Sequence, residues 1–384
     1  MKAIVFGLAM LIIFSSVSSC QQSKQPILYE SGFKVIKAVD SSRVYKTDAG
    51  DKHYLYYRPL DIDVWYPAQK PVQDSFLLFG HYLTLFESRA NYYTDSQAGN
   101  GLANQFAKSF SEQLKCSTPE QILAYPTKTL KNAGEAPGKF PLIIYLASYN
   151  GMGYENIELL ETLTRSGYVV AAISSIGRYP GDMTMQQPDL MEQVKDASFT
   201  LNRLKKLRHV DSTRIGVLGY SWGGMAGTIL AMSRTDVNAL ISLDGSEFHH
   251  YGFEKEDDDN FNNIIASADF RKKTISTPYL RLESGVAEIG DREETENRKD
   301  SVYNFLGKLA GEKHIYKILQ ASHGDFSYLP SIVKRSGNCK TNESYATITK
   351  LVLGYFNQQL KQIPRQVFAD SLKTESGKTV QTIL

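Results

Sequence analysis

The sequence predicts an α/β protein, in which a mostly parallel sheet is covered by helices on both faces. From residue 140 onward, short apolar runs alternate with longer segments in which apolar residues recur every three or four positions. This is the pattern of strands alternating with helices. The apolar runs are nearly continuous, as expected of strands that are buried on both faces. A length of 384 residues, of which 42% are hydrophobic, suffices for one large domain.

Residues 31–363 are predicted to form this domain. Its first expected strand is 57–68, where apolar and polar residues alternate as they do near a sheet edge. Residues 70–135 are too many for a plain loop and are interpreted as a helical insertion. Further strands are expected at 142–147, 169–173, 215–218, 239–243, 279–282 and 315–319, and helices at 156–165, 190–207, 225–232, 298–309 and 344–360.

Three other segments are expected at the surface. Residues 246–270 form a second insertion, and its acidic run at 254–259 is interpreted as a solvated loop, because it lacks the alternating ligand spacing of a calcium loop. Residues 291–300 are similarly charged and are expected at the surface. Residues 364–384 are interpreted as a polar tail that frays.

The N-terminus has the features of a secretion signal. Met1 and Lys2 precede an apolar run at 3–14 that is too short to span a membrane stably. Residues 17–20, Val-Ser-Ser-Cys, resemble a bacterial lipobox. That resemblance implies that residues 1–19 are removed, that Cys20 carries a lipid, and that residues 20–30 tether the protein to a membrane at its periplasmic or cell-surface face. A plain signal peptide with an incidental cysteine is the alternative.

The other two cysteines, the net charge and the absence of certain motifs limit the bonds, partners and cofactors that we expect. Export would permit Cys116 and Cys339 to form a disulfide, and the sequence leaves this question open. A net charge of +2 implies no strong attraction to nucleic acid. The sequence has no histidine or cysteine cluster with metal-ligand spacing and no nucleotide-binding glycine motif, so we predict neither a metal nor a cofactor.

Residues 219–223, Gly-Tyr-Ser-Trp-Gly, match the G-x-S-x-G motif of a nucleophile elbow. They lie between a predicted strand and a predicted helix, which is the context that the motif requires. Glycines two positions to either side of Ser221 let the strand and the helix approach closely. We therefore predict that Ser221 is a nucleophile; the alternative is a glycine-rich turn used only for packing.

A serine nucleophile needs a base, and the base needs an acid that orients it. In a parallel sheet these groups lie beyond the carboxyl ends of the strands. His323 follows the strand at 315–319 on that side. The other histidines are excluded by chain order (His53, His81, His209), by position at the amino end of a strand (His314) or by assignment to the second insertion (His249, His250).

Candidates for the acid and the oxyanion hole follow from the same geometry. Asp244 ends the strand next to the nucleophile strand, whereas Glu283, Glu288 and Asp291 follow the next strand and remain competitors. An oxyanion needs backbone N–H donors. One is expected from Trp222, and the other from the turn at 150–153, Asn-Gly-Met-Gly, unless that turn is a generic glycine turn.

These motifs together make residues 57–326 similar to α/β-hydrolases of the platelet-activating-factor acetylhydrolase and dienelactone hydrolase-like group. The resemblance lies in 58–59 (Arg-Pro) leading into 64–68 (Val-Trp-Tyr-Pro-Ala), 151–153 (Gly-Met-Gly), the elbow, 243–244 (Leu-Asp), and 322–323 (Ser-His) followed by 325–326 (Asp-Phe). It implies the α/β-hydrolase fold with Ser221 as nucleophile, Asp244 as acid, His323 as base, and the amides of Met152 and Trp222 as the oxyanion hole. Two features depart from the group: Asn150 replaces a histidine, and the second insertion is long. Dienelactone hydrolases proper use a cysteine nucleophile, where this sequence has serine.

The expected function is that of a cofactor-free serine esterase, which hydrolyses a short-acyl or lipid-like ester through an acyl-enzyme. Amide cleavage or acyl transfer on the same triad is one alternative, and a catalytically silent binding lipoprotein is another. Residues 76–93 and the insertion after Asp244 are expected to roof the substrate pocket.

Overall fold

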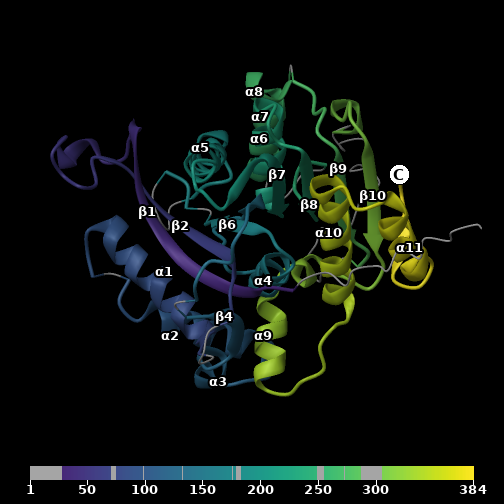
Figure 1. Ribbon diagram of the computed structural model, residues 1–384. Helices are drawn as coiled ribbons and strands as arrows, with labels where there is room; N and C mark the ends of the chain where they lie inside the picture. The colour runs from purple at the N-terminus through teal and green to yellow at the C-terminus, as the bar shows by residue number, and fades with distance from the viewer. Residues whose placement is uncertain are drawn as a thin grey trace, which may run out of the picture.

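The computed structural model describes residues 28–70, 75–97, 99–131, 133–174, 176–178, 183–248, 255–271, 273–286 and 305–384. The expected signal peptide, Cys20, His249, His250, Glu288 and the segment 291–300 lie outside these residues. In the described part of the chain, eleven strands form one mixed sheet with helices on both faces (Figure 1).

The central strands of the sheet are parallel, as the alternating pattern predicts. The order across the sheet is β11-β10-β9-β8-β7-β5-β6-β2-β1-β4-β3, and the run from β10 to β6 is parallel throughout. The strands are β1 (Glu30–Val44), β2 (Tyr57–Ala68), β3 (Phe76–Leu78), β4 (Pro126–Leu130), β5 (Phe140–Leu146), β6 (Val169–Ile173), β7 (Val210–Tyr220), β8 (Ala239–Leu243), β9 (Tyr279–Ser284), β10 (Lys313–Ile318) and β11 (Val380–Thr382). All six strands predicted from residue 140 onward are confirmed.

The helices are α1 (Phe79–Thr94), α2 (Leu102–Leu114), α3 (Pro119–Leu123), α4 (Ile157–Arg165), α5 (Gln187–Leu204), α6 (Trp222–Ser233), α7 (Lys255–Ala266), α8 (Ala268–Arg271), α9 (Leu329–Ser336), α10 (Ser344–Lys361) and α11 (Arg365–Glu375). The helices predicted at 156–165, 190–207, 225–232 and 344–360 are confirmed as α4, α5, α6 and α10. Of the helix expected at 298–309, residues 305–308 form a short 3₁₀ helix and 298–304 lie outside the described residues.

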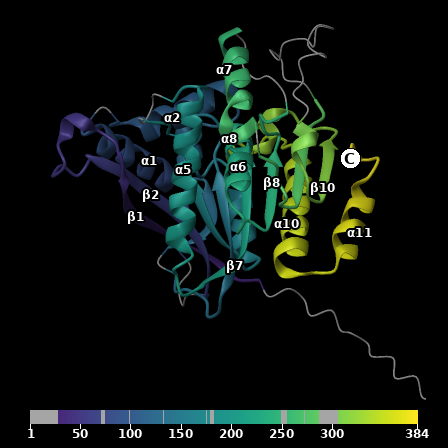
Figure 2. The same ribbon diagram turned by 90° about the horizontal axis from the view of Figure 1, so that it is seen from above.

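Two hydrophobic cores lie on opposite faces of the sheet. Ile143 and Tyr145 of β5 belong to the core beneath α4 and α10, whereas Leu142 and Ile144 belong to the core beneath α5 and α6. The side chains alternate because successive residues of a strand point to opposite faces. Figure 2 shows α5 and α6 side by side over one face of the sheet. Burial on both faces explains why the central strands are nearly all apolar.

The amino-terminal part of the sheet differs from the prediction. The first strand is β1, which pairs antiparallel with β2 from Glu30 opposite Ala68 to Asp40 opposite Arg58. Since β2 lies between β1 and β6, its expected place near a sheet edge was wrong. Trp65, which the alternation put with the polar residues, is fully buried and stacks on Tyr82 of α1. The helices of the first insertion cover this face of β2, so both of its faces are buried.

The first insertion contains α1, α2 and α3 between β3 and β4. These elements lie together at one end of the sheet (Figure 1). Cys116, between α2 and α3, forms a disulfide with Cys339, which follows α9. The sequence left this pairing open, and the bond joins the insertion to the carboxyl-terminal part of the chain.

The second insertion and the tail are more ordered than predicted. Residues 255–266 form α7 instead of a loop, with the acidic side chains in its first turn, where they interact favourably with the helix dipole. Phe261 and Ile264, on the apolar side of α7, are buried. The predicted fraying tail forms α11 and β11, which pairs antiparallel with β10. Phe368 of α11 packs against Tyr355 of α10, so this segment belongs to the domain.

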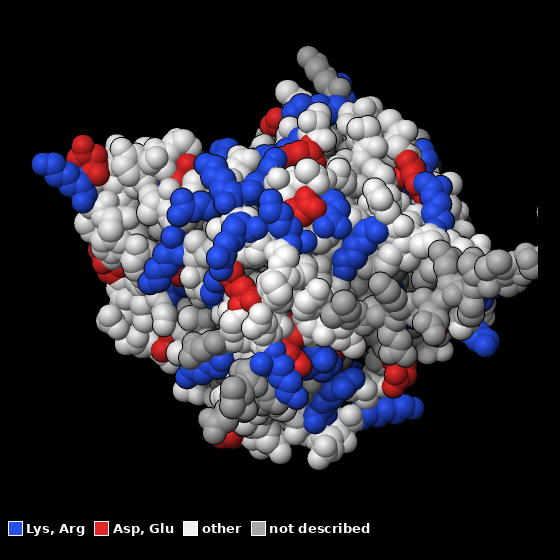
Figure 3. Space-filling view, viewed as in Figure 1, with Lys and Arg blue, Asp and Glu red and all other residues white. Residues whose placement is uncertain are grey.

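The surface carries charges of both signs. On the face viewed in Figure 3, Lys and Arg side chains gather in the upper and central part, with Asp and Glu side chains among them. No helix in the part of the chain that the structure describes is both long and apolar enough to cross a membrane.

Candidate active site

Ser221 lies in a sharp turn between β7 and α6, as the elbow motif predicts. Its backbone has φ 54° and ψ −119°, a conformation that a non-glycine residue rarely adopts. A Cβ atom on Gly219 would lie 2.1 Å from the carbonyl oxygen of Gly223, and one on Gly223 would lie 2.1 Å from that of Leu146. Both glycines are therefore required for the strand, the turn and the helix to approach this closely.

His323 lies within hydrogen-bond distance of this serine. It begins a 3₁₀ helix, His323–Phe326, just after β10, and its Nε2 atom is 3.0 Å from Ser221 Oγ. Ser322 and Asp325 form a capping box at the start of that helix, and the Tyr220 hydroxyl donates a hydrogen bond to the His323 carbonyl at 3.0 Å. These contacts fix the backbone that carries the imidazole.

Asp244 lies on the other side of the imidazole. Its Oδ2 atom is 2.7 Å from His323 Nδ1, and its Oδ1 atom accepts a hydrogen bond from the Ser284 amide at 2.8 Å. Burial opposes ionisation of this carboxyl, but the hydrogen bond and charge of His323, with the charge of Arg281, hold its pKa at about 2. The carboxylate is therefore ionised at neutral pH and favours the tautomer with the proton on Nδ1.

The competing acids lie elsewhere or are not described. Glu283 forms ion pairs with Arg281 at 3.3 Å and with Lys317 at 3.7 Å. Glu288 and Asp291 are outside the described residues. Among the described residues, Asp244 is thus the acid that the structure brings to His323.

The turn predicted to supply the second oxyanion donor lies beside the elbow. Tyr149 packs edge-on against Trp222, the first residue of α6, with ring centroids 6.0 Å apart. Met152 is buried within the turn, and Asn150 has a positive φ of 49°. Amides in the first turn of a helix point out of its amino terminus, which suits the Trp222 amide to a negative charge near Ser221.

Glu155 holds this turn in place. Its carboxylate accepts hydrogen bonds from the Ser148 amide at 2.8 Å, the Ser148 hydroxyl at 2.6 Å and the Tyr145 hydroxyl at 2.7 Å. Its backbone carbonyl accepts another from the Tyr328 amide at 3.0 Å, five residues beyond His323. Burial raises the pKa of Glu155, although these hydrogen bonds oppose the shift. Glu155 therefore joins the turn to the segment that carries His323.

Comparisons with known proteins bear on both the fold and the site. The model of the Dienelactone hydrolase family matches residues 129–268, a range that includes Ser221 and Asp244. The chain has the α/β-hydrolase fold, and residues 129–268 are similar to a dienelactone hydrolase domain. A solved structure, the ferulic acid esterase from Streptomyces cinnamoneus, matches with a TM-score of 0.60 and 20% identity over 93% of this chain and 97% of that chain, which shows a shared fold. No curated protein sequence matches the chain.

The match to this family supports an ester hydrolase. Its site also contains a buried ion pair that the sequence did not reveal. Arg281 is buried beside Asp244, with its guanidinium 3.2 Å from Glu247, and it donates a hydrogen bond to the Gly245 carbonyl at 2.8 Å. The hydroxyl of Tyr279 donates to the same carboxylate of Glu247 at 2.7 Å. These contacts fix the loop that follows Asp244.

Glu155 and Arg281 were both missed by sequence reasoning. Each is an isolated charged residue without a motif around it, and its partners come from distant parts of the chain. The one usable signal was their position, since Arg281 lies within an apolar strand and Glu155 follows the glycine turn. A charge in such a place is expected to have a buried partner.

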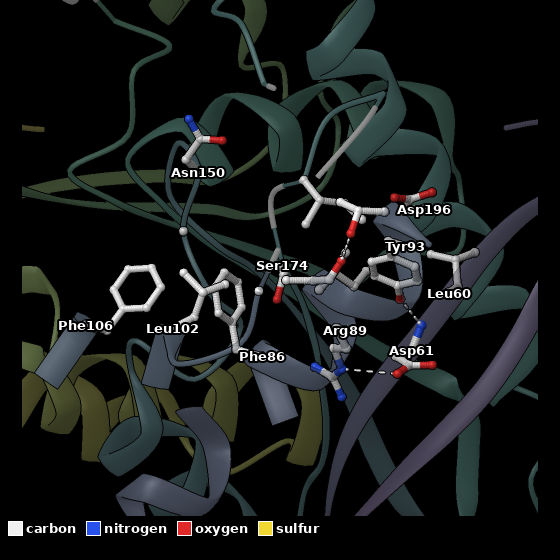
Figure 4. A pocket seen from close by; sticks show the side chains of 16 residues that line it. Leu60, Asp61, Phe86, Arg89, Tyr93, Leu102, Phe106, Asn150, Ser174 and Asp196 are labelled. Atoms are coloured by element: carbon white, nitrogen blue, oxygen red, sulfur yellow. Dashed lines mark hydrogen bonds and ion pairs between the residues drawn. The ribbon is translucent and has the colours of Figure 1, made fainter. Parts of the chain in front are cut away.

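A pocket of about 400 Å³ opens beside the turn, between the helices of the first insertion, β2 and the end of β6 (Figure 4). Asn150 and Gly151 of the turn form part of its wall, and α1 contributes Phe86 and Tyr93. Thus α1 lines a pocket, but Ser221, Asp244 and His323 are not among the residues that line it, so the expected roof of the substrate pocket stays a prediction. The described part of the second insertion does not line this pocket.

Among the described residues, no group of His, Cys, Asp or Glu side chains is arranged to hold a metal ion.

Proposed function

We propose that this hydrolase cleaves carboxylic esters through an acyl-enzyme on Ser221, with His323 as base and Asp244 as the acid that orients it. The observation that carries the proposal is the hydrogen-bonded series from Ser221 Oγ to His323 Nε2 at 3.0 Å and from His323 Nδ1 to Asp244 Oδ2 at 2.7 Å. The three side chains come from separate loops, and packing of the fold alone does not require them to be aligned in this way.

The proposed reaction has two halves. In the first, Ser221 Oγ bonds to the ester carbonyl carbon while His323 Nε2 takes the hydroxyl proton; the tetrahedral intermediate then collapses, and His323 returns the proton to the leaving alcohol. In the second, His323 takes a proton from water, whose oxygen attacks the acyl-enzyme. The acid leaves, and Ser221 regains its proton. Asp244 remains a carboxylate throughout and stabilises the imidazolium.

We assign the oxyanion hole to the backbone amides of Trp222 and Met152. Support comes from the place of Trp222 at the amino terminus of α6 and from the contact of Tyr149 with it, which brings the turn beside the elbow. Loss of one such donor typically costs about a hundredfold to a thousandfold in rate. The substrates we propose are short-acyl or lipid-like esters, for which no cofactor is needed.

The direct test is labelling by a fluorophosphonate, which phosphonylates an activated serine. Wild type is expected to be labelled and to hydrolyse 4-nitrophenyl acetate, whereas Ser221→Ala should lose both. Ser233→Ala, at the other end of α6, is the matched control and should behave as wild type. Equal labelling of wild type and Ser221→Ala would refute the assignment. A peptide anilide turned over faster than the ester would favour amide cleavage instead.

We also propose that the protein is an exported lipoprotein anchored to a membrane through Cys20, as the lipobox-like residues 17–20 imply. The disulfide between Cys116 and Cys339 supports an oxidising compartment, because disulfides persist in exported proteins and are rare in a reducing cytosol.

The anchor is tested by expressing the full chain in a bacterial host supplied with a labelled fatty acid. Wild type and the control Ser23→Ala are expected to carry the label and to sediment with membranes. Cys20→Ser should carry none, because the thiol that accepts the lipid is gone. Label retained in Cys20→Ser would contradict the proposal.

A further inference from the structure

The pocket beside the turn is connected to the proposed nucleophile through the turn itself. Tyr149 contacts Trp222, and the next two residues, Asn150 and Gly151, line the pocket. Gly153, after Met152, donates its amide to the hydroxyl of Ser174, which also lines the pocket. A group held in this pocket would therefore lie against the same loop that we assign to the oxyanion hole.

The wall of the pocket is apolar and aromatic. Phe86 of α1 and Phe106 of α2 meet edge to face with ring centroids 5.2 Å apart, and Leu102 lies beside them (Figure 4). Leu60 of β2 and Ile173 of β6 close another side. Aromatic edges and faces favour contact with another ring in these geometries. The surface suits an apolar group that includes a ring.

The charged residues of the wall are engaged in ion pairs. Arg89 binds Asp63 through two contacts of 2.5 and 2.6 Å and binds Asp61 at 3.2 Å. Asp196 accepts a hydrogen bond from Arg58 at 2.7 Å and another from Arg43 at 2.6 Å. A charged ligand group would have to compete with these pairs after losing its hydration, which is costly. The pocket therefore favours a neutral group.

The order of the strands decides which side of the ester enters the pocket. The nucleophile strand β7 has β8, β9 and β10 on one side, and His323 follows β10. The pocket lies on the other side of β7, where β5, β6 and β2 follow in order. His323 must face the leaving alcohol in order to protonate it. The leaving group is thus directed toward His323, and the acyl group is directed toward the pocket.

We infer that this pocket is the acyl-binding subsite and that it takes a neutral, apolar acyl group bearing a ring, such as an arylalkanoyl group. This inference rests on the proposed serine hydrolase function and specifies its substrate class. It assigns substrate selection to α1 and α2 of the first insertion. Acetyl groups, which offer no ring to Phe86 and Phe106, should depend little on the pocket.

The test compares 4-nitrophenyl 3-phenylpropanoate with 4-nitrophenyl acetate in three proteins. Leu102→Trp fills the pocket, and Gln105→Trp is the matched control, because Gln105 is exposed on the same helix. Leu102→Trp is expected to lower kcat/KM for the phenylpropanoate by at least about tenfold, the usual effect of changing the fit of an apolar pocket. The acetate should stay within about twofold for Gln105→Trp, and Leu102→Trp should lose less activity on the acetate than on the phenylpropanoate. The singly charged 4-nitrophenyl succinate should be a poorer substrate of wild type than the phenylpropanoate.

Several outcomes would overturn the inference. Equal losses on acetate and phenylpropanoate would show that Leu102→Trp damages the site in general. Selective loss on acetates with bulky ring-bearing alcohols would assign the pocket to the leaving group. Absence of acetate turnover and of fluorophosphonate labelling in wild type would instead defeat the proposed function.

A binding measurement keeps the inference testable in that case. Neutral 3-phenylpropanamide should bind Ser221→Ala at least about tenfold more tightly than it binds the double variant Ser221→Ala, Leu102→Trp. Equal affinities would count against the subsite without any need for catalysis.

Discussion

At the scale of single residues, Asp244 shows how a buried acid stays ionised. It is nine-tenths removed from solvent, yet His323, the Ser284 amide and the charge of Arg281 favour its carboxylate and hold its pKa at about 2. The folded-state pKa lies below the ordinary value of 3.8. Its contribution to stability is therefore present above pH 3.8 and is lost as the pH falls through about 2.

Replacing Asp244 by Asn should separate this effect from packing, because the side chain keeps its shape. We expect kcat for ester hydrolysis to fall about 10⁴-fold, since the imidazole loses the acid that sets its tautomer. The unfolding free energy, measured by denaturant titration, should fall by about 2 kcal/mol at neutral pH, and the difference should vanish at low pH.

Glu283→Gln is the matched control for this change. Glu283 is the competing acid on the neighbouring strand, and its contacts are with Arg281 and Lys317. Its variant should keep most of the activity. If Glu283→Gln loses as much activity as Asp244→Asn, the assignment of the acid is wrong.

The sequence could locate the site residues that belong to a motif or that follow a predicted strand. Ser221 and Asp244 come directly after buried strands, and His323 follows β10 within a few residues; parallel strands bring such positions to one edge. Glu155 and Arg281 could not be found in this way. Their positions depend on contacts across the fold, such as that of Glu155 with Ser148 and Tyr328, which no local pattern encodes.

At the scale of elements, α4 is coupled to the edge of the sheet through a buried acid. Glu161 accepts hydrogen bonds from the Lys128 amide at 2.8 Å and from the Thr129 hydroxyl at 2.6 Å, both on β4. Burial raises its pKa to about 7, although these hydrogen bonds oppose the shift. Because the folded-state pKa lies above the ordinary 4.5, the stabilising contribution is complete below pH 4.5 and is lost as the pH rises through about 7.

Glu161→Gln should remove this pH dependence, because the amide keeps a neutral acceptor for both hydrogen bonds. The unfolding free energy of wild type is expected to fall relative to that of the variant by about 3 kcal/mol as the pH rises from 4.5 to about 8. Denaturant titrations at several pH values measure the difference. Parallel curves for the two proteins across this range would show that Glu161 is ionised in the folded state throughout.

The elements that the sequence predicted share a physical property. The strands β5, β6 and β8 are recognised because burial on both faces makes them apolar, and α5 because one face is continuously apolar. The strand β1 was missed because it carries Lys34, Lys37 and Asp40 and is only partly buried, so its pairing with β2 fixes it. The strand β11 has three residues and exists only through its bonds to β10.

At the scale of the whole molecule, the first insertion and the central sheet together build the site. The sheet holds Ser221, Asp244 and His323 at one edge, whereas α1 and α2 supply much of the wall of the adjoining pocket. The central architecture was predictable, because parallel strands have a strong sequence pattern. For the insertion, only its helical character was predictable. The way in which its helices dock depends on side-chain contacts, such as that of Trp65 with Tyr82.

The disulfide between Cys116 and Cys339 closes a covalent loop, and the chain continues beyond both cysteines. The bridged residues are 223 positions apart, and Ser221, Asp244 and His323 all lie between them. A single proteolytic cut anywhere in that interval would leave both fragments covalently joined. In a compartment that contains proteases but keeps disulfides oxidised, the nicked enzyme could therefore retain all three residues until a reductant opened the bridge.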